Sequence, residues 1–275
     1  ALLALVSSVL WGGADFLGGT ASRRLPAPVV VAASQLAGLV AIWATAVGLG
    51  ELDEPTDYVP WAVAAGLAGL VGLTTFYAAL AAGTMGVVSP IAALGVVVPV
   101  VVGLARGERP AVLQLVGILV AVAGVVLASG PELRGRAGAR PLVLAAVAAV
   151  GFGLALLFIA EGSRTSTVMT LVTMRATSVT VLAVALAVLA RRTAVGVPAR
   201  LVPVLVLVGL ADVAANLTFG LASTRGLVSV VAVLGSLYPV VTVLLALVLH
   251  GERLAPVQVV GVAGALGGVA MIAAG

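Results

Sequence analysis

The sequence predicts an all-α integral membrane protein in which ten transmembrane helices form two inverted five-helix repeats around a central cavity. Three observations predict this fold class: the composition, the spacing of the apolar runs and an internal repeat. Of 275 residues, 62% are hydrophobic and 9% are charged, whereas about a quarter are charged in an ordinary soluble domain. A water-soluble fold is therefore excluded.

Apolar runs punctuated by Gly, Pro and Arg delimit ten candidate helices. Crossing a hydrocarbon core of about 30 Å takes about 20 apolar residues, so ten crossings leave only short connections. Sequential helices are then expected to be antiparallel neighbours. The predicted ranges are 1–21, 28–50, 59–82, 86–105, 111–129, 141–160, 167–190, 201–223, 226–249 and 255–275.

The chain also repeats itself, which marks a duplicated architecture. Seven residues between Gly86 and Pro99 recur at an offset of 140, and after Pro99 the offset becomes 144, so that Gly107-Glu108-Arg109 recurs as Gly251-Glu252-Arg253. We predict a first repeat over residues 1–130, a basic connecting loop over 131–140 and a second repeat over 141–275. Five helices per repeat make the second copy enter the membrane from the opposite side, which is the inverted-repeat design of secondary transporters.

Three features together resemble the EamA-type drug/metabolite transporters. They are the W-G-G-x-D-F start at Trp11 to Phe16, the Ser-Pro and mid-helix Pro of the helix at 86–105, and the doubled P...G-E-R...Q...G pattern. The resemblance covers the whole chain. It implies a ten-helix carrier of small metabolites in the cell membrane, often an exporter of amino acids or related compounds, with a cavity lined by both halves. The chain departs from strict two-fold symmetry because Gln35 stands where the second repeat has Arg175.

The orientation in the membrane stays open. Ten spans put both termini on one side, together with loops that carry four arginines, while the opposite loops carry nine. The positive-inside rule then predicts external termini, whereas the family resemblance implies cytoplasmic termini. The four are Arg106, Arg109, Arg164 and Arg225, and the nine are Arg23, Arg24, Arg134, Arg136, Arg140, Arg191, Arg192, Arg200 and Arg253.

Asp15, Arg175 and Asp212 are charges inside predicted spans, which are costly in a bilayer and so mark functional candidates. At about 1.5 Å of rise per residue, Arg175 lies ~10 Å, Asp212 ~16 Å and Asp15 ~20 Å below the terminus-side surface. We expect Arg175 and Asp212 to be able to pair, and a contact between Asp15 and Arg175 to be less favoured. The cluster either receives a zwitterion or relays a proton, or it is a structural ion pair.

Polar and aromatic side chains near these charges complete the predicted substrate site. Asn216 follows Asp212 by four residues on one helix face, and Trp11 precedes Asp15 by four. The Trp11 indole is placed to stack on a substrate while the Asp15 carboxylate addresses an amine, with packing of the indole as the alternative. The remaining predicted contacts are Tyr77, Ser236 and Tyr238.

Three prolines inside the helices at 86–105 and 226–249 are predicted hinges, namely Pro90, Pro99 and Pro239. A proline removes one backbone hydrogen bond and frees a carbonyl group. A kink needed only for packing is the alternative, and the pairing of Pro99 with Pro239 across the repeat favours the hinge. Gly107-Glu108-Arg109 and its copy are interpreted as helix caps and interface anchors.

The leading functional hypothesis is a secondary transporter for small polar metabolites, with amino acids first, moved by alternating access and with a proton as a candidate coupling ion. An integral membrane enzyme acting on lipid or prenyl chains and a channel are the alternatives. The absence of Cys and Lys from the sequence excludes disulfides, thiolate metal sites and a P-loop. We expect no enzyme activity, cofactor, bound metal or nucleic-acid partner. We do expect contact with the lipid bilayer and a monomer or homodimer.

Overall fold

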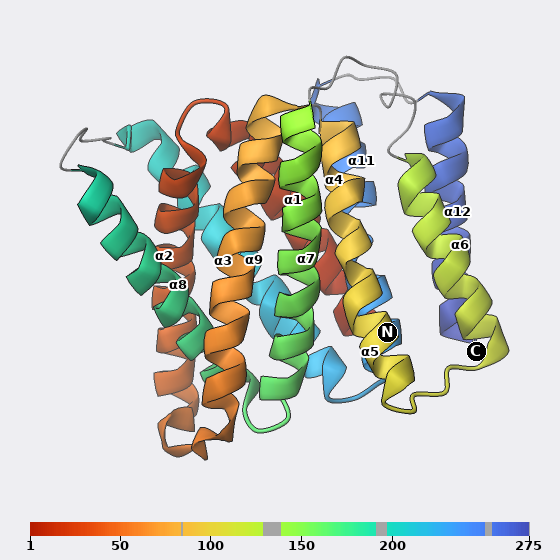
Figure 1. The fold of residues 1–275 in the computed structure, drawn as a ribbon, viewed down its shortest axis with the longest axis horizontal. Coiled ribbons are helices and arrows are strands. Elements are labelled where there is room, and N and C mark those ends of the chain that lie inside the picture. Colours follow the sequence, from red (N-terminus) through yellow and green to blue (C-terminus); the bar gives the residue numbers. More distant parts are fainter. Residues whose placement is uncertain (84, 129–138, 191–196, 251–254, 275) are drawn as a thin grey trace.

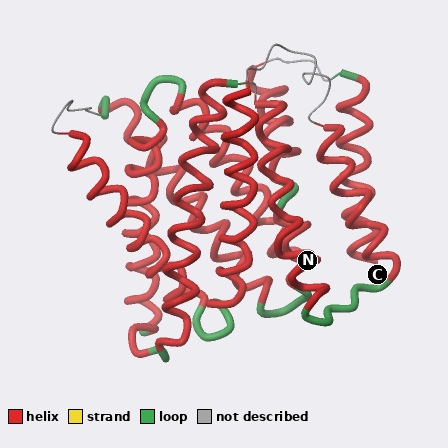
Figure 2. The backbone as a smooth tube through the Cα atoms, viewed as in Figure 1, coloured by secondary structure: helices red, strands yellow, loops and turns green. Residues whose placement is uncertain are grey.

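The computed structural model describes residues 1–83, 85–128, 139–190, 197–250 and 255–274 (Figure 1). Helices are the only regular structure over these residues (Figure 2). The first repeat contains α1 (Leu2–Ser22), α2 (Ala27–Leu49), α3 (Val59–Ala82), α4 (Met85–Ala93), the 3-10 turn η3 (Leu94–Val96), α5 (Val97–Ala105) and α6 (Val112–Ala128). The second contains α7 (Ala139–Gly162), α8 (Thr167–Ala190), α9 (Val202–Ser223), α10 (Val228–Gly235), α11 (Tyr238–His250) and α12 (Pro256–Ala274).

All ten predicted helices are confirmed, and the observed bounds agree with the predicted ones to within two residues. Six stretches of these helices are long and apolar enough to cross a membrane: Leu2–Ser22, Ala27–Leu49, Thr56–Ala82, Arg140–Gly162, Thr167–Val188 and Ala199–Ser223. Shorter apolar helices provide the other four segments, at Ile91–Ala105, Val112–Gly124, Val228–Thr242 and Val259–Ile272. Together they indicate a multi-pass membrane protein.

Two of the predicted helices are interrupted near their middle. The turn η3 separates α4 from α5, and Ser236 and Leu237 separate α10 from α11. Pro99 is the third residue of α5 and Pro239 the second of α11. A proline is tolerated in the first turn of a helix, where its missing N–H has no partner to lose. The chain therefore restarts a helix at each of these prolines, whereas the backbone at Pro90 stays helical within α4.

The two repeats interlock, because most helices pack chiefly against helices of the other repeat. The first helix of each repeat lies against the third of the other, which gives the pairs α1 with α9 and α7 with α3. Helices in the same position also meet, as α2 with α8 and α6 with α12. In Figure 1, α7 begins at the upper end of the bundle, and both chain termini lie toward the lower end.

Glycines let some of these helices approach until their backbones touch. A Cβ atom on Gly209 of α9 would lie 2.1 Å from the Ser34 carbonyl oxygen of α2, and one on Gly124 of α6 would lie 2.2 Å from the Ala265 nitrogen of α12. Small residues at such crossings are typical of helix packing in lipid. The pair α6 and α12 thus joins the two repeats at the edge of the bundle.

Loops predicted to share one face are joined there. Ser166, before α8, donates a hydrogen bond to Glu51, after α2, at 3.1 Å. Arg106, after α5, forms an ion pair with Glu161 near the end of α7. These contacts involve the ends of the second, fourth and sixth predicted helices, at 28–50, 86–105 and 141–160. In a chain that crosses the membrane ten times, all three ends lie on the same side, so the contacts agree with ten crossings.

Glu108 caps a helix of the other repeat. Its two carboxylate oxygens accept hydrogen bonds from the backbone N–H groups of Val228 at 2.9 Å and Ser229 at 3.1 Å, at the start of α10. A carboxylate suits the positive end of a helix dipole. The interpretation of the first Gly-Glu-Arg motif as a cap and anchor is confirmed for Glu108, and its copy at residues 251–253 lies outside the described residues.

Replacing Glu108 by Ala is expected to destabilise the folded protein by about 1–3 kcal/mol, because two N–H groups at a part-buried helix start lose a charged acceptor. Thermal unfolding of the detergent-solubilised protein measures the change. Asp57→Ala is the control, since Asp57 is an exposed acidic residue of the short 3-10 turn Thr56–Tyr58 before α3. Equal melting temperatures for E108A and D57A would contradict the cap.

Candidate functional site

A cavity of about 90 Å³ lies inside the helix bundle. Helices of both repeats line it, which confirms the predicted central cavity. The polar lining residues are Trp11, Asp15, Gln35, Arg175, Ser178, Asp212, Asn216, Ser236 and Tyr238.

Asp212 on α9 is the centre of a polar network. The guanidinium of Arg175, on α8, pairs with Asp212 through NH2 and Oδ2 at 2.7 Å. Trp11 Nε1 donates a hydrogen bond to Oδ1 at 3.1 Å. The expected pair of Arg175 and Asp212 is confirmed, and the indole that the sequence offered for stacking also serves to hold the carboxylate.

Two amides complete the shell of Asp212. Asn216 Nδ2 donates to Oδ1 at 3.1 Å and to the Asp212 backbone carbonyl at 2.7 Å, which fits side chains four residues apart on one helix. Gln35 Nε2 donates to Oδ2 at 3.3 Å. With these donors and Arg175, both oxygens of the Asp212 carboxylate are satisfied by the protein.

Sequence reasoning missed two polar lining residues, Ser178 and Gln35, and Gln35 belongs to the network around Asp212. Its Oε1 accepts a hydrogen bond from Arg175 NH1, so Gln35 bridges the guanidinium and the carboxylate of Asp212. Gln35 and Arg175 occupy the same position of the two repeats, 140 residues apart. Equivalent residues of two repeats meet only near the pseudo-two-fold axis that relates the repeats. The equivalence of Gln35 and Arg175 was therefore the signal in the sequence that could have assigned Gln35 to the site.

Asp15 on α1 differs from Asp212 in having no partner. It is 7% exposed and lines the cavity, and no described residue donates a hydrogen bond or forms an ion pair with its carboxylate. Asp212 is the charged residue that acts electrostatically on it. The expectation that Asp15 and Arg175 do not touch agrees with this arrangement.

Tyr238 and Ser236 lie at the break between α10 and α11, and both line the cavity. The Tyr238 hydroxyl is buried without a hydrogen-bond partner among the described residues. The Ser236 hydroxyl donates a hydrogen bond to the Val233 carbonyl at 2.9 Å, near the end of α10. The break thus brings two hydroxyl groups to the cavity, and only that of Ser236 is hydrogen-bonded within the described residues.

Tyr77 does not line the cavity. It is 1% exposed, and its hydroxyl lies where a Cβ atom on Gly18 of α1 would be only 2.2 Å away. Its ring packs against Phe76 at a centroid distance of 6.1 Å. The structure therefore brings together seven of the eight predicted contact residues and places Tyr77 in the packed layer behind α1.

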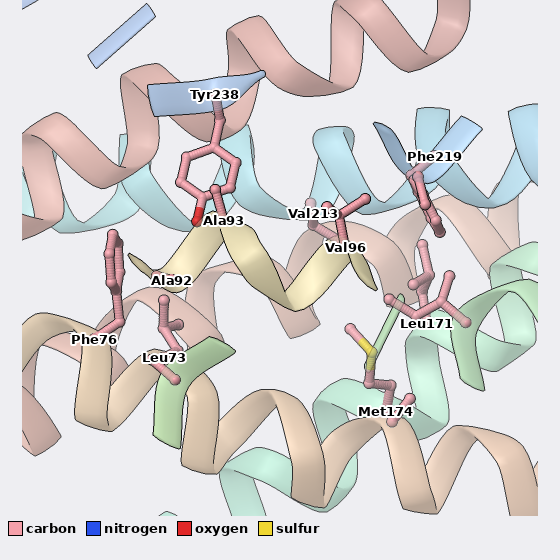
Figure 3. Close-up of a cluster of buried hydrophobic side chains, with 14 of the residues drawn as sticks. Leu73, Phe76, Ala92, Ala93, Val96, Leu171, Met174, Val213, Phe219 and Tyr238 are labelled. Atoms are coloured by element: carbon pink, nitrogen blue, oxygen red, sulfur yellow. The ribbon is translucent and has the colours of Figure 1, made fainter. Parts of the chain in front are cut away.

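The opposite side of the cavity is apolar. Leu73 of α3, Ala92 and Ala93 of α4, Val96 of η3 and Met174 of α8 line it. Figure 3 labels these residues and shows the Tyr238 ring directed toward α4. Phe76 and Tyr238 meet edge to face at 6.4 Å at one end of this cluster. Aromatic and aliphatic side chains with a few placed polar groups are typical of a small-molecule site.

A metal centre finds no support in the described part of the chain, where no three His, Cys, Asp or Glu side chains gather. Asp15 and Asp212 are the two carboxylates of the cavity, and the second is already paired with Arg175. The arrangement offers binding and charge compensation.

Comparison with known proteins supports a relationship over the full length. A solved crystal structure with a TM-score of 0.75 aligns over 98% of this chain and 94% of its own chain at 21% identity, a likeness that shows the fold. Among curated proteins there is no significant match. The model of the EamA-like transporter family matches residues 1–130 and again residues 139–274. The chain, with its two matched repeats, therefore belongs to the EamA-like transporter family.

Proposed function

We propose that this protein is a secondary transporter of the cell membrane that moves small polar metabolites through the central cavity by alternating access. One observation carries the proposal: a cavity in the middle of an apolar helix bundle contains a buried, unpartnered carboxylate, Asp15, beside an apolar wall. Membership of a transporter family supports the same class of activity.

Alternating access is supported by the arrangement of the repeats. Equivalent helices pair across the two halves, and α1 and α7 begin at opposite ends of the bundle (Figure 1). Inverted repeats of this kind expose one central site to either side when one half rocks against the other. Pro99 and Pro239 are proposed hinges, because each lies just after a helix break whose residues line the cavity, Val96 and Ser236. Pro90 is proposed as a hinge only on the sequence.

For the substrate, the geometry supports an amine. Asp15 is free to bind an ammonium group, and the Trp11 indole lines the same space. Amino acids or related compounds, moved in the export direction, remain the proposal that the family resemblance supplies. The substrate carboxylate of an amino acid has no unpaired counter-ion among the described lining residues, because the charge of Arg175 is already paired with Asp212.

A proton is the proposed competitor of the substrate at Asp15. A buried carboxylate without a donor is costly unless a cation or a proton neutralises it. Tyr77 from α3, Tyr238 from α11, Asp212 from α9 and Arg175 from α8 are the titratable or charged groups around it. We therefore expect amine movement in one direction to be coupled to proton movement in the other.

Counterflow into proteoliposomes tests the transport proposal. Liposomes loaded with an unlabelled amine or amino acid are expected to accumulate the labelled compound transiently and saturably, and an inside-acidic pH gradient is expected to increase accumulation of an amine at least about threefold. Empty liposomes and liposomes in which an ionophore dissipates the gradient are the controls. Absence of counterflow for amines, amino acids and nucleosides alike would refute the carrier. Ionic currents far above carrier rates would favour the channel instead, and metal-dependent turnover of a lipid the enzyme.

A further inference from the structure

We propose that the cavity selects amphipathic monocations, meaning a single ammonium group attached to an apolar body, over zwitterions and anions. This inference rests on the proposed transport function and names the substrate class of the same cavity. It follows from the net charge of the lining residues, from the side of the cavity on which that charge lies, and from the bonds that already engage Arg175.

The charged lining of the cavity has one carboxylate in excess. Its charged residues are Asp15, Arg175 and Asp212, that is, two carboxylates against one guanidinium. Arg175 is 3% exposed, its NH1 donates to Gln35, and its NH2 pairs with Asp212. Asp212 in turn accepts hydrogen bonds from Trp11 and Asn216. The negative charge of Asp15 alone has no counter-charge among these residues, and a substrate cation supplies one.

A substrate carboxylate finds no unpaired cation among the described lining residues. The guanidinium of Arg175 is paired with Asp212, and the Ser236 hydroxyl donates a hydrogen bond to the Val233 carbonyl. The Tyr238 hydroxyl and Arg175 Nε have no hydrogen-bond partner within the described part of the chain, but neither adds an uncompensated positive charge. A second negative charge beside Asp15 and Asp212 would meet repulsion in a setting of low dielectric. A zwitterion therefore loses at its carboxylate part of what it gains at its ammonium group, and an anion meets a net negative lining.

The charge is confined to one side of the cavity, so the substrate is expected to have two unlike ends. Asp15 has Ala155 as its counterpart in the second repeat, 140 residues on, and both line the cavity. Around Ala155 lie Leu73, Phe152 and Leu156, which offer only apolar surface. Leu73 of this wall is labelled in Figure 3. An ammonium at Asp15 thus leaves an apolar body against this wall, where burial of apolar surface is favourable.

Four probes that change one group at a time test this selectivity. Phenethylamine is a monocation, phenylalanine adds a carboxylate, 3-phenylpropionate keeps the carboxylate without the amine, and ethylamine keeps the amine without the aromatic body. Binding to the purified protein is measured by calorimetry, and transport by inhibition of counterflow. Phenethylamine is expected to bind at least about tenfold more tightly than phenylalanine and ethylamine, which is about 1.4 kcal/mol, with no binding of 3-phenylpropionate.

Variants of Asp15 assign the effect to its charge. Asp15→Asn is expected to remove the preference of phenethylamine over phenylalanine, while Asp15→Glu keeps it. Asp57→Asn, at an exposed position of the short 3-10 turn Thr56–Tyr58, is the matched control and is expected to keep the wild-type ratio. Size-exclusion profiles and melting temperatures establish that each variant is folded.

The outcomes separate this inference from the transport proposal. If phenylalanine binds and exchanges as well as phenethylamine, or better, the substrate class proposed here is wrong and the transporter stands. If Asp15→Asn is folded and keeps the cation preference, Asp15 is not the cation site. If none of the four probes binds or exchanges while nucleosides do, the inference fails and the carrier is retained. If no solute exchanges, both proposals fail.

Discussion

Replacing Arg175 by Gln is expected to destabilise the protein by about 3 kcal/mol or more, because Asp212 is left buried without its counter-ion. Arg175 is 3% exposed and the side chain of Asp212 is 15% exposed. Removing one partner of such a pair costs about 3–5 kcal/mol. The lower end applies here, since Trp11, Gln35 and Asn216 still donate hydrogen bonds to the carboxylate.

The double variant Arg175→Gln with Asp212→Asn distinguishes an unpaired charge from lost packing. With both charges gone, no uncompensated ion remains, and most of the stability is expected to return. Unfolding of the three variants in mixed micelles gives the coupling between the residues, and Arg200→Gln, in an exposed turn, is the control. A double variant as unstable as the sum of the two single variants would show that the pair contributes no mutual stabilisation.

Filling the cavity is expected to abolish transport without unfolding the protein. Ala155 on α7 is 6% exposed, and it borders the cavity. The phenyl ring that Ala155→Phe adds is directed at this cavity, so its cost in stability is expected to stay within the ~1–3 kcal/mol of an overpacked core. The same group occupies the space that a substrate needs. Counterflow is expected to fall by more than about tenfold.

Ala146→Phe is the matched control for this variant. Ala146 lies on the same helix and is exposed on the outside of the bundle, so the same substitution there changes the lipid-facing surface and leaves the cavity intact. Its transport is expected to equal that of the unmodified protein. Full counterflow by a folded A155F protein would show that the substrate does not pass through this cavity.

Some of the site was predictable because each residue carried a local signal. Asp15, Arg175 and Asp212 are charges within apolar runs, and a charge in a bilayer is placed where the bundle interior accepts it. Trp11 and Asn216 followed from helical spacing to two of these charges. The rise per residue of a helix set the depths at which Arg175 and Asp212 meet.

Other parts of the site carried no such signal. Gln35 is an ordinary polar residue until the packing of α2 against α8 brings it to Arg175. Tyr77 had the right chemistry, but its hydroxyl lies against Gly18, and Tyr77 is not among the residues that line the cavity. Glu108 was expected to cap a helix, and which helix it caps depends on the other repeat arriving beside it.

The sequence by itself determined the ten helices, the membrane setting and the duplication, since apolar periodicity, segment length and self-similarity are local or additive properties of the chain. Only the tertiary structure decided that Asp212 is neutralised by Arg175 while Asp15 is not. In the sequence the two aspartates cannot be distinguished, because each is a single acidic residue within an apolar segment. What separates them is the identity of the side chains that residues far away in the chain bring within about 3 Å, and that depends on how the helices cross.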